Sequence, residues 1–339
     1  MHPVVPQFAA APVHLARGLQ EVLGVEGQVG KKLPFNEEPE GYYRLIRTSG
    51  PSYFLKVLPN AYLPGQTRAE AIARALKRAG ISVNAALDGF PKPWGTGHHV
   101  FAYAFVNARF AEQACGGDLR QLGAGVAGLH RAMKHLDQAG PICLQAEARC
   151  KHVGALRTAL ADGALSAPYP AAQLRALLEP DYTHLLFSAD GQVLHGDLNY
   201  GNAIFPVGDG RPVILDFEDA VQSYGTPRID LALVLERFVL VQTRDDEQAR
   251  RLGTAFLAAY LEQMPDESGN APVPLQHILI GMAQRSICLL AEIARAGLRV
   301  ADDEWEKFRF LHHQARARAS LLAGFDRILD GEAARGEEK

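Results

Sequence analysis

The pattern of apolar and polar positions changes near residue 108 of the chain. Before that point, short apolar runs with alternating polar positions predict strands over 28–35, 42–48, 53–58 and 100–106. Helical spacing of apolar residues predicts helices over 12–24 and 67–79. The tetrapeptide 49–52 (SGPS) is typical of a turn between the second and third strands. The first part therefore predicts a small sheet crossed by a helix.

After residue 108 the spacing of apolar residues becomes mainly helical. Helices are predicted over 119–136, 146–162, 171–187, 230–242, 246–263, 275–296 and 302–329. Residues 192–217 interrupt them with strands, including a hairpin whose 208–210 turn (GDG) joins 203–205 to 212–217. We therefore predict an α+β fold with two unequal lobes, residues 1–108 and 109–330, followed by a flexible tail at 331–339.

Composition narrows the class of protein. Of the 339 residues, 47% are hydrophobic and 22% are charged, which is typical of a globular protein. The net charge of −3 offers no general attraction for nucleic acid or an acidic membrane surface, so a bound phosphate must be neutralised locally. The four cysteines are scattered without a C-x-x-C pair, which favours a reduced, cytoplasmic setting. We expect no signal peptide, because the N-terminus lacks a basic region and is broken by prolines. We expect no membrane span, because no uninterrupted apolar stretch reaches the roughly 20 residues that a span needs.

The segment His195–Asn202 (HGDLNYGN), followed by Val213–Glu218 (VILDFE), carries the strongest chemical signal. The spacing His-x-Asp-x4-Asn and then strand-Asp is that of a kinase catalytic loop and its magnesium-binding aspartate. Asp216 ends an apolar strand and Asn202 begins another, so both offer oxygen ligands that suit Mg²⁺. Asp197 lies on the loop, where it could accept a hydroxyl proton. Each alone could be a turn or cap residue, but together they predict phosphoryl transfer.

These motifs resemble those of the aminoglycoside phosphotransferase and choline kinase superfamily, relatives of the protein kinases. The similarity extends from about residue 15 to about residue 325 and includes the segments 122–130 (LGAGVAGLH), 227–235 (PRIDLALVL) and 256–260 (FLAAY). The resemblance implies a two-lobed protein-kinase-like fold, with ATP as the phosphate donor (GTP being the alternative) and Mg²⁺ as the metal.

The resemblance also implies roles for single residues of the larger lobe. Asp197 would be the catalytic base, with Asn202 and Asp216 as metal ligands. His195 would support the loop, and Asp230 would brace it from the next helix. Asp230 also suits a plain helix N-cap.

In the small lobe, the resemblance makes Lys56 the lysine that contacts the α- and β-phosphates, with Glu70 as its partner. Alternatively, Lys56 is a solvated edge residue, and Glu70 completes a capping box with Thr67 or pairs with Arg74.

The loop 36–41 (NEEPEG) would cover the phosphates, although its three acids would repel them unless they point outward. We expect Gly41, or the backbone around Asn36, to make that contact. The adenine is expected against the segment 107–110, which begins at Asn107.

The segment after Asp216 bears on the acceptor. Pro227 follows so soon that no room is left for a long activation segment, which disfavours a protein kinase. The Asp-Phe-Glu triplet is similar to that of choline and ethanolamine kinases. Glu218 and Asp219, with Glu236, could make the acceptor side acidic, which suits a cationic amino alcohol or aminosugar. Homoserine, sugars and nucleoside-like alcohols stay open, as does the oligomeric state.

The predicted function is therefore an ATP- and Mg²⁺-dependent kinase of a small molecule, with no nucleic-acid or membrane partner. Two alternatives remain at this point. One is a nucleotide-binding pseudokinase scaffold without turnover, which the acid-rich loop suggests. The other is a protein kinase.

Overall fold

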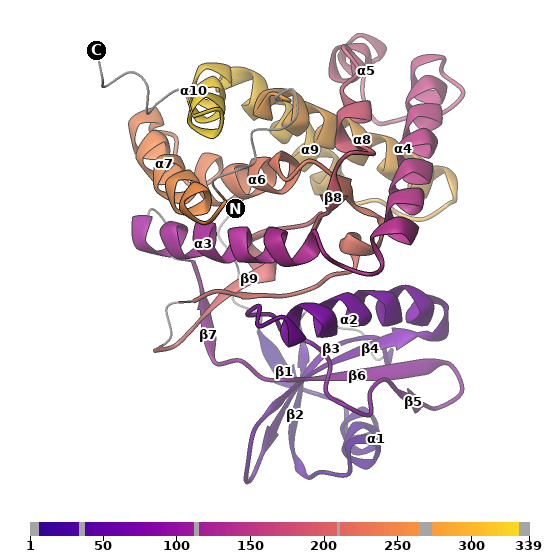
Figure 1. Ribbon diagram of the computed structural model, residues 1–339. Coiled ribbons are helices and arrows are strands. Elements are labelled where there is room, and N and C mark those ends of the chain that lie inside the picture. Colours follow the sequence, from indigo (N-terminus) through magenta and orange to yellow (C-terminus); the bar gives the residue numbers. More distant parts are fainter. Residues whose placement is uncertain (1–6, 34–37, 112–114, 209–210, 265–272, 332–339) are drawn as a thin grey trace. The chain divides into compact units, whose positions relative to one another are not determined.

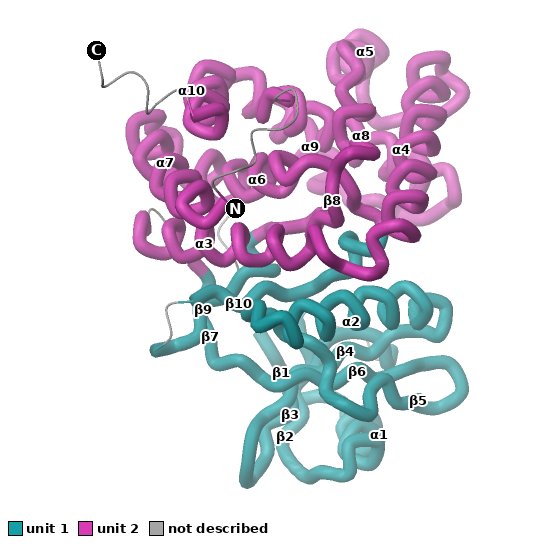
Figure 2. The backbone as a smooth tube through the Cα atoms, in the orientation of Figure 1, with its two compact units in different colours: residues 1–110, 200–221 teal, residues 111–199, 222–339 magenta. Residues whose placement is uncertain are grey.

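The computed structural model describes residues 7–33, 38–111, 115–208, 211–264 and 273–331. Its chain contacts form two compact units, shown in Figure 2. Unit 1 combines residues 1–110 with 200–221, and unit 2 combines 111–199 with 222–339. The boundary predicted after residue 108 differs by two residues from the end of the first stretch. The segment 200–221, expected in the second lobe, packs instead with unit 1. Apart from residue 331, the predicted tail lies outside the described residues.

An antiparallel six-stranded sheet, in the order β1-β2-β3-β4-β6-β5, forms the main part of unit 1 (Figure 1). Its strands are β1 (Phe8–Ala10), β2 (Gly27–Lys32), β3 (Gly41–Arg47), β4 (Tyr53–Pro59), β5 (Lys92–Trp94) and β6 (His98–Ala104). The four predicted strands are all present. The two unpredicted strands, β1 and β5, are three residues each, too short to show an alternating pattern.

A separate apolar cluster covers each face of this sheet. Because side chains alternate along a strand, Tyr43, Leu55 and Ala102 share one face, where they pack with Leu19 of helix α1 (Val13–Leu23). The opposite face carries Phe101 and Tyr103, which pack with Ala86 and with partly buried Phe54. Lys56 lies on this second face, which its alternation with the buried Leu55 and Val57 dictates.

Helix α2 (Leu63–Arg78) begins four residues before the predicted start. A 3₁₀ turn at Asn60–Tyr62 leads into it, and a proline sits in its first turn, where the missing N–H costs no hydrogen bond. Thr67 therefore lies inside the helix, and the alternative capping box from Thr67 to Glu70 does not form.

A hairpin from far along the chain completes unit 1. A three-stranded sheet has the order β10-β9-β7, formed by β7 (Ala108–Phe110), β9 (Ala203–Pro206) and β10 (Val213–Ile214). On the other side, the Ile214 N–H donates to the Ser82 carbonyl (2.9 Å), and the Asn84 N–H donates to the Ile214 carbonyl (3.1 Å). Both edges of the β9–β10 hairpin, which precedes Asp216, are thus hydrogen-bonded to the remainder of unit 1. Residues 209–210 of its predicted turn lie outside the described residues.

Unit 2 is mostly helical. Its helices are α3 (Gly116–Met133), α4 (Ala139–Ala161), α5 (Ala171–Leu178), α6 (Arg228–Leu235), α7 (Asp246–Gln263), α8 (Leu275–Arg295), α9 (Asp302–Ala317) and α10 (Ala319–Leu329). A 3₁₀ turn at Thr183–Leu186 and a π-helical turn at Glu236–Leu240 join them, as does a two-stranded sheet of β8 (Gln192–Val193) and β11 (Tyr224–Gly225). The fold class, a small antiparallel sheet followed by a mainly helical part, is confirmed.

Two predicted helices were too long. The helix predicted over 171–187 ends at Leu178, because Glu179 precedes a proline and is extended. The helix predicted over 302–329 is two helices, with Arg318 at the break. The Arg318 guanidinium donates to the carbonyls of Leu240 (3.0 Å) and Thr243 (2.8 Å), so a tertiary contact accompanies the interruption.

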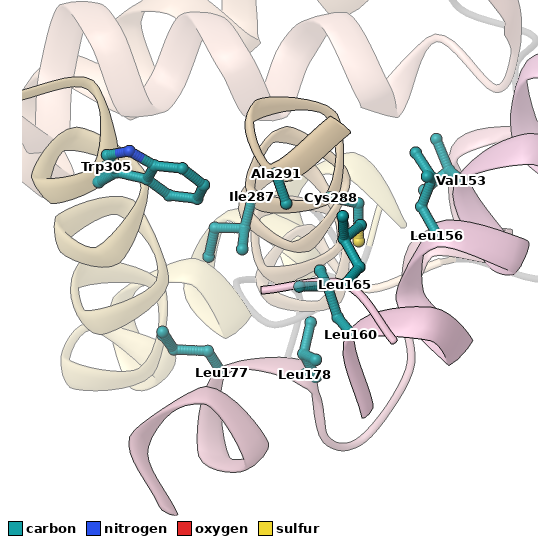
Figure 3. Packing of buried hydrophobic residues seen from close by; sticks show 10 residues of the cluster. All are labelled: Val153, Leu156, Leu160, Leu165, Leu177, Leu178, Ile287, Cys288, Ala291 and Trp305. Carbon is teal, nitrogen blue, oxygen red and sulfur yellow. The ribbon is translucent and has the colours of Figure 1, made fainter. Parts of the chain in front are cut away.

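Helix α8 lies within the apolar core of unit 2. Its buried Ile287, Cys288 and Ala291 pack with Leu156 of α4 and Trp305 of α9 (Figure 3). By length and composition alone α8 could cross a membrane, with a mean hydropathy of 1.3 over 18 residues, contrary to the expectation that no segment would. However, 56% of that window is buried inside the structure, which is typical of a core helix.

Candidate active site

Asp230 fixes the backbone at the start of the loop His195–Asn202. It is fully buried in the first turn of α6, two residues after the helix starts, so it is not the N-cap. Its carboxylate accepts hydrogen bonds from the backbone N–H groups of His195 (2.8 Å) and Gly196 (2.9 Å). His130 Nε2 lies 3.1 Å from the same carboxylate, and His130 Nδ1 lies 3.0 Å from the Tyr260 hydroxyl. The loop backbone is therefore fixed by a buried hydrogen-bonded network.

The same network keeps Asp230 ionised. Burial by itself raises the pKa of the Asp230 carboxyl. The hydrogen bond and charge of His130, with the charge of His195 and the Gly196 N–H, outweigh burial and lower that pKa below its usual value. A charged carboxylate is the stronger acceptor, so ionisation reinforces its hold on the loop.

The Asp197 side chain is oriented by the residue two places after it. Asn199 Nδ2 donates to Asp197 Oδ2 at 2.8 Å, and the Asp197 N–H donates to His195 Nδ1 at 3.3 Å. Because His195 Nδ1 accepts this bond, a neutral His195 carries its proton on Nε2. His195 thus supports the loop through its ring as well as its backbone. The sequence reasoning missed Asn199, although its place two residues after Asp197 is a common spacing for such a bond.

Asp216 and Asn202 lie at the same end of the β9–β10 hairpin. The Leu215 N–H donates to the Asn202 carbonyl across the hairpin at 2.9 Å. Asp216 follows with φ 59°, the one left-handed residue other than glycine in the described part of the chain. Such a conformation costs energy and often marks a functional position. The Asp216 side chain is exposed, so the turn presents a carboxylate to solvent.

These two residues fit a bound Mg²⁺. A carboxylate and an amide supply hard oxygen ligands, and Mg²⁺ in kinases takes its other ligands from water and phosphate oxygens. Within the described residues, no three His, Cys, Asp or Glu side chains gather as a metal site. Because their oxygens are ligands of the kind that Mg²⁺ prefers, Asn202 and Asp216 would hold the ion, which would offset negative charge on the triphosphate.

Lys56 forms an ion pair with Glu218, and both residues belong to unit 1. The Lys56 side chain is 8% exposed, and its ammonium lies 5.7 Å from the centre of the Tyr42 ring. Burial lowers the Lys56 pKa, while the charges of Asp216 and Glu70 oppose that shift. Glu218 was expected on the acceptor side. The structure places it against Lys56 instead.

Glu70 does not pair directly with Lys56 in the described structure. Its Oε1 accepts from the Tyr103 hydroxyl (2.5 Å) and from Gln66 Nε2 (3.1 Å), and its Oε2 accepts from the Ala86 N–H (2.8 Å). Both carboxylate oxygens are thus already hydrogen-bonded. Glu70 acts on Lys56 through its charge alone, which differs from the predicted ion pair.

A row of aromatic rings beside Lys56 was not predicted. The Tyr42 and Phe54 rings stack with centroids 5.7 Å apart, and the Phe54 and Tyr103 centroids lie 6.2 Å apart. Burial and the Asp216 charge raise the Tyr42 pKa, so its hydroxyl stays protonated. The alternation of strand side chains could have revealed the row, because each ring shares the face of Lys56.

The remaining predicted residues lie at a strand end, between strands or in a turn. Gly41 opens β3 with φ 133°, a conformation that favours glycine. Next to it, Glu40 Oε1 lies 2.8 Å from His98 Nε2, and this hydrogen bond lowers the pKa of the Glu40 carboxyl. Asn107 is exposed between β6 and β7, and its carbonyl accepts from the Val207 N–H at 3.0 Å. Asp219 begins a 3₁₀ turn and is half-buried. Residues 36–37 of the loop lie outside the described part.

Comparison with known proteins shows similarity in fold. The chain is similar in fold to an aminoglycoside phosphotransferase from Alicyclobacillus acidocaldarius, with a TM-score of 0.55, 14% identity and 98% of each chain covered. A choline kinase, LicA, from Streptococcus pneumoniae gives a TM-score of 0.55 at 18% identity, covering 92% of this chain and 99% of its own. An amicoumacin kinase, in complex with AMP-PNP, Ca²⁺ and its ligand, gives 0.53 at 19% identity, covering 84% and 87%.

At these identities the solved structures show the fold alone. No curated protein sequence matches the chain. The sequence model of the phosphotransferase enzyme family, however, matches residues 31–266, which is more than half of the chain and includes Lys56, Asp197 and Asp216. The chain therefore belongs to the phosphotransferase enzyme family and is a small-molecule kinase.

Proposed function

We propose that this kinase transfers the γ-phosphate of ATP, bound with Mg²⁺, to a hydroxyl group of a small cytoplasmic metabolite. The observation that carries the proposal is the fixed Asp197 carboxylate. Asn199 holds one of its oxygens, and the loop beneath it is hydrogen-bonded to Asp230. The solved amicoumacin kinase, which holds AMP-PNP and Ca²⁺, supports a nucleoside triphosphate with a divalent ion as donor. GTP is the alternative donor.

Each residue then has a chemical task. The Lys56 ammonium offsets charge on the triphosphate oxygens, and Asn202 and Asp216 would hold Mg²⁺, which would supply further positive charge there. Asp197 accepts the proton of the acceptor hydroxyl as its oxygen bonds to the γ-phosphorus. The bond from that phosphorus to the β,γ-bridging oxygen breaks, and ADP leaves with the electron pair. General-base help of this kind contributes about 10²- to 10⁴-fold in rate.

The structure gives little support to a cationic acceptor. That expectation rested on Glu218, Asp219 and Glu236. Glu218 forms an ion pair with Lys56, so its charge is already compensated. Glu236 is 1% exposed and lies 3.0 Å from Arg237, and burial raises its pKa. Cationic amino alcohols and aminosugars therefore belong in the acceptor test as comparison compounds.

The experiment that tests the function is ADP release from MgATP in the presence of a panel of acceptors. The panel contains amino alcohols, aminosugars, simple sugars and hydroxy acids. Asp216→Asn should abolish turnover and weaken Mg²⁺-dependent ATP binding, because it removes the charged metal ligand. Asp197→Asn should spare ATP binding and lower turnover by about 10²- to 10⁴-fold.

Asp162→Asn is the matched control, because Asp162 is exposed at the end of α4, away from the catalytic loop in sequence. It should behave as the unmodified protein. Undiminished acceptor-stimulated ADP release in Asp197→Asn would remove Asp197 from its assigned role. The same result in Asp216→Asn would sink the metal assignment.

A further inference from the structure

A second lysine lies near Lys56 on the same face of the six-stranded sheet. Tyr42 pairs with Lys56 across β3 and β4, and the register of β2 with β3 puts Lys32 on the other side of Tyr42. Because side chains alternate along a strand, all three point to the face opposite α1. Strand β2 is paired with β1 as well as with β3, so Lys32 does not lie on an edge strand.

The ring of Tyr42 is in contact with both lysines. The Lys32 ammonium lies 5.1 Å from the centre of this ring, and the Lys56 ammonium lies 5.7 Å from it. An ammonium at such a distance is attracted by the negative face of an aromatic ring. Burial and the charge of Asp216 raise the pKa of Tyr42, so the proposed metal ligand also acts on this residue. Two cations and the Asp216 carboxylate therefore lie around one side chain.

The two ammoniums differ in their acidic partners. Lys56 forms an ion pair with Glu218, whereas the exposed Lys32 forms none with any carboxylate of the described residues. Like charges beside the same ring repel each other, and an anion bound there would offset that repulsion. The oxygens of a triphosphate would supply the negative charge.

Arg44 of β3 lies on the same face but is placed differently. It follows Tyr42 by two residues, and its guanidinium lies 4.2 Å from the centre of the Phe105 ring. Arg44 is thus outside the cross-strand row that Lys32, Tyr42 and Lys56 form. Lys32 is the cation that shares the row of Lys56.

The described end of the loop 36–41 is bonded to the opposite face of the sheet. Lys31 Nζ donates to the Glu38 carbonyl, and the Tyr43 hydroxyl donates to the Pro39 carbonyl at 2.6 Å. Tyr43 belongs to the apolar cluster that packs with α1, and Lys31 is its partner in register. This part of the loop, expected over the phosphates, is therefore held by side chains of the α1 face.

The described acids of the loop act on that same α1 face. Glu40 Oε1 lies 2.8 Å from His98 Nε2, and His98 alternates along β6 with Val100, a member of the α1 cluster. Burial lowers the Lys31 pKa, and the charges of Glu40 and Glu38 oppose that shift. These carboxylates therefore do not stand beside the lysine pair on the other face, where they would repel a triphosphate.

We propose that Lys32 is a second cation for the triphosphate of the donor nucleotide, and that the Tyr42 ring holds Lys32 and Lys56 in place beside it. The Lys32 ammonium contacts the β- and γ-phosphate oxygens, which replaces the contact expected from the loop 36–41. An ammonium binds phosphate as a point charge, which suits an exposed lysine at the end of a strand. The proposal rests on the proposed function, because it adds a residue to the donor site of that reaction.

The test compares two nucleotides that share a base and a ribose and differ in the number of phosphates. Calorimetric titration measures the Kd for MgAMP-PNP and, by displacement, the Kd for AMP. Lys32→Gln should raise the Kd for MgAMP-PNP at least fivefold and change the Kd for AMP less than twofold, because AMP lacks the β- and γ-phosphates. Lys32→Arg keeps the charge and should stay within twofold of the unmodified protein for both nucleotides.

Lys77→Gln is the matched control, because Lys77 is an exposed lysine in the last turn of α2. It should leave both constants unchanged. An unchanged Kd for MgAMP-PNP in Lys32→Gln, or an equal rise for AMP, would overturn the proposal. With acceptor-stimulated ADP release still present, that result would leave the kinase reaction intact.

The converse outcome separates the two proposals in the other direction. A loss of MgAMP-PNP affinity in Lys32→Gln, with AMP unaffected and no ADP release with any acceptor, would support the role of Lys32 and contradict the proposed reaction. Failure of the unmodified protein to bind MgAMP-PNP would overturn both proposals together.

Discussion

Glu218 forms an ion pair with Lys56, although 161 sequence positions separate them and both lie in unit 1. Glu218 comes two residues after Asp216, so the segment that carries the proposed metal ligand also carries a partner for Lys56, the proposed phosphate-binding lysine. If Lys56 binds the triphosphate as we propose, the Glu218 carboxylate competes for the same ammonium.

Removing the Glu218 charge should tighten nucleotide binding. The Glu218 side chain is 48% exposed, and ion pairs of this kind contribute about 0.2–1 kcal/mol. Glu218→Gln should therefore lower the Kd for MgAMP-PNP by about 1.5- to 5-fold, measured by calorimetric titration. Lys56→Gln should raise that Kd. Weaker binding in Glu218→Gln would mean that this carboxylate assists the metal.

Asn199→Ala should slow catalysis without weakening ATP binding. The change removes the 2.8 Å hydrogen bond that orients the Asp197 carboxylate. A hydrogen bond to a charged group contributes about 1.5 kcal/mol, which corresponds to roughly a tenfold fall in kcat. Steady-state kinetics with the best acceptor would measure kcat and the KM for ATP. A changed KM for ATP with constant kcat would refute the positioning role of Asn199.

Gly123 permits close packing between α3 and α7, so Gly123→Ala should destabilise the protein. A Cβ at this position would overlap the carbonyl oxygen of Phe256. Overpacking of this kind costs about 1–3 kcal/mol. Gly154→Ala on α4 is the matched control, because nothing lies within 4 Å of its added Cβ, and it should stabilise by about 0.5–1 kcal/mol. Urea unfolding measures both, and equal effects would contradict the packing argument.

Acidification should destabilise unit 2 through His312. Burial, with the charges of Arg316 and His313, lowers the His312 pKa from 6.5 to about 4, and its Nε2 is buried without a hydrogen-bond partner in the described structure. Between these two values the unfolded chain binds more protons at this residue than the folded protein. Stability therefore falls as the pH drops from 7 to 5, by about 2 kcal/mol from this group.

The control for that prediction is the neighbouring exposed histidine. Urea unfolding at pH 7 and pH 5 measures the loss of stability in the unmodified protein. His312→Gln should reduce the loss by about 2 kcal/mol, whereas His313→Gln should leave it nearly unchanged. An identical pH dependence in all three proteins would show that His312 is not the group responsible.

Strand alternation and motif spacing, which depend only on neighbouring residues, predicted the strands and the position of the loop His195–Asn202. Strand alternation located β2, β3, β4 and β6, and the spacing from His195 to Asn202 located the loop that Asp230 braces. The motif also placed Asp216 at the end of a strand. That Asp216 adopts a left-handed conformation was not predicted, because no glycine or asparagine marks the position.

Long-range partners could not be predicted from spacing. Strand alternation is enough to assign the face of the sheet on which Lys56 lies, but it does not show whether Glu70 or Glu218 reaches that lysine. Glu70 does not pair with Lys56 because its two carboxylate oxygens accept hydrogen bonds from the Tyr103 hydroxyl and the Ala86 N–H. The break at Arg318 likewise depends on carbonyls more than 70 positions earlier in the chain. Such choices follow from tertiary packing, which a single sequence does not display.

Unit 1 consists of two separate stretches of the chain, residues 1–110 and 200–221, and this determines where a chimeric enzyme can be joined. The β9–β10 hairpin is hydrogen-bonded to β7 and to Ser82–Asn84, so a cut at residue 110 that discards the hairpin would leave both edges without their partners. An exchange of unit 2 between relatives should therefore replace residues 111–199 and 222–331 and retain 200–221. A graft designed in this way would carry the helices of unit 2 and the loop from His195 to Asn199 to a new host, while the host kept its own β9–β10 hairpin.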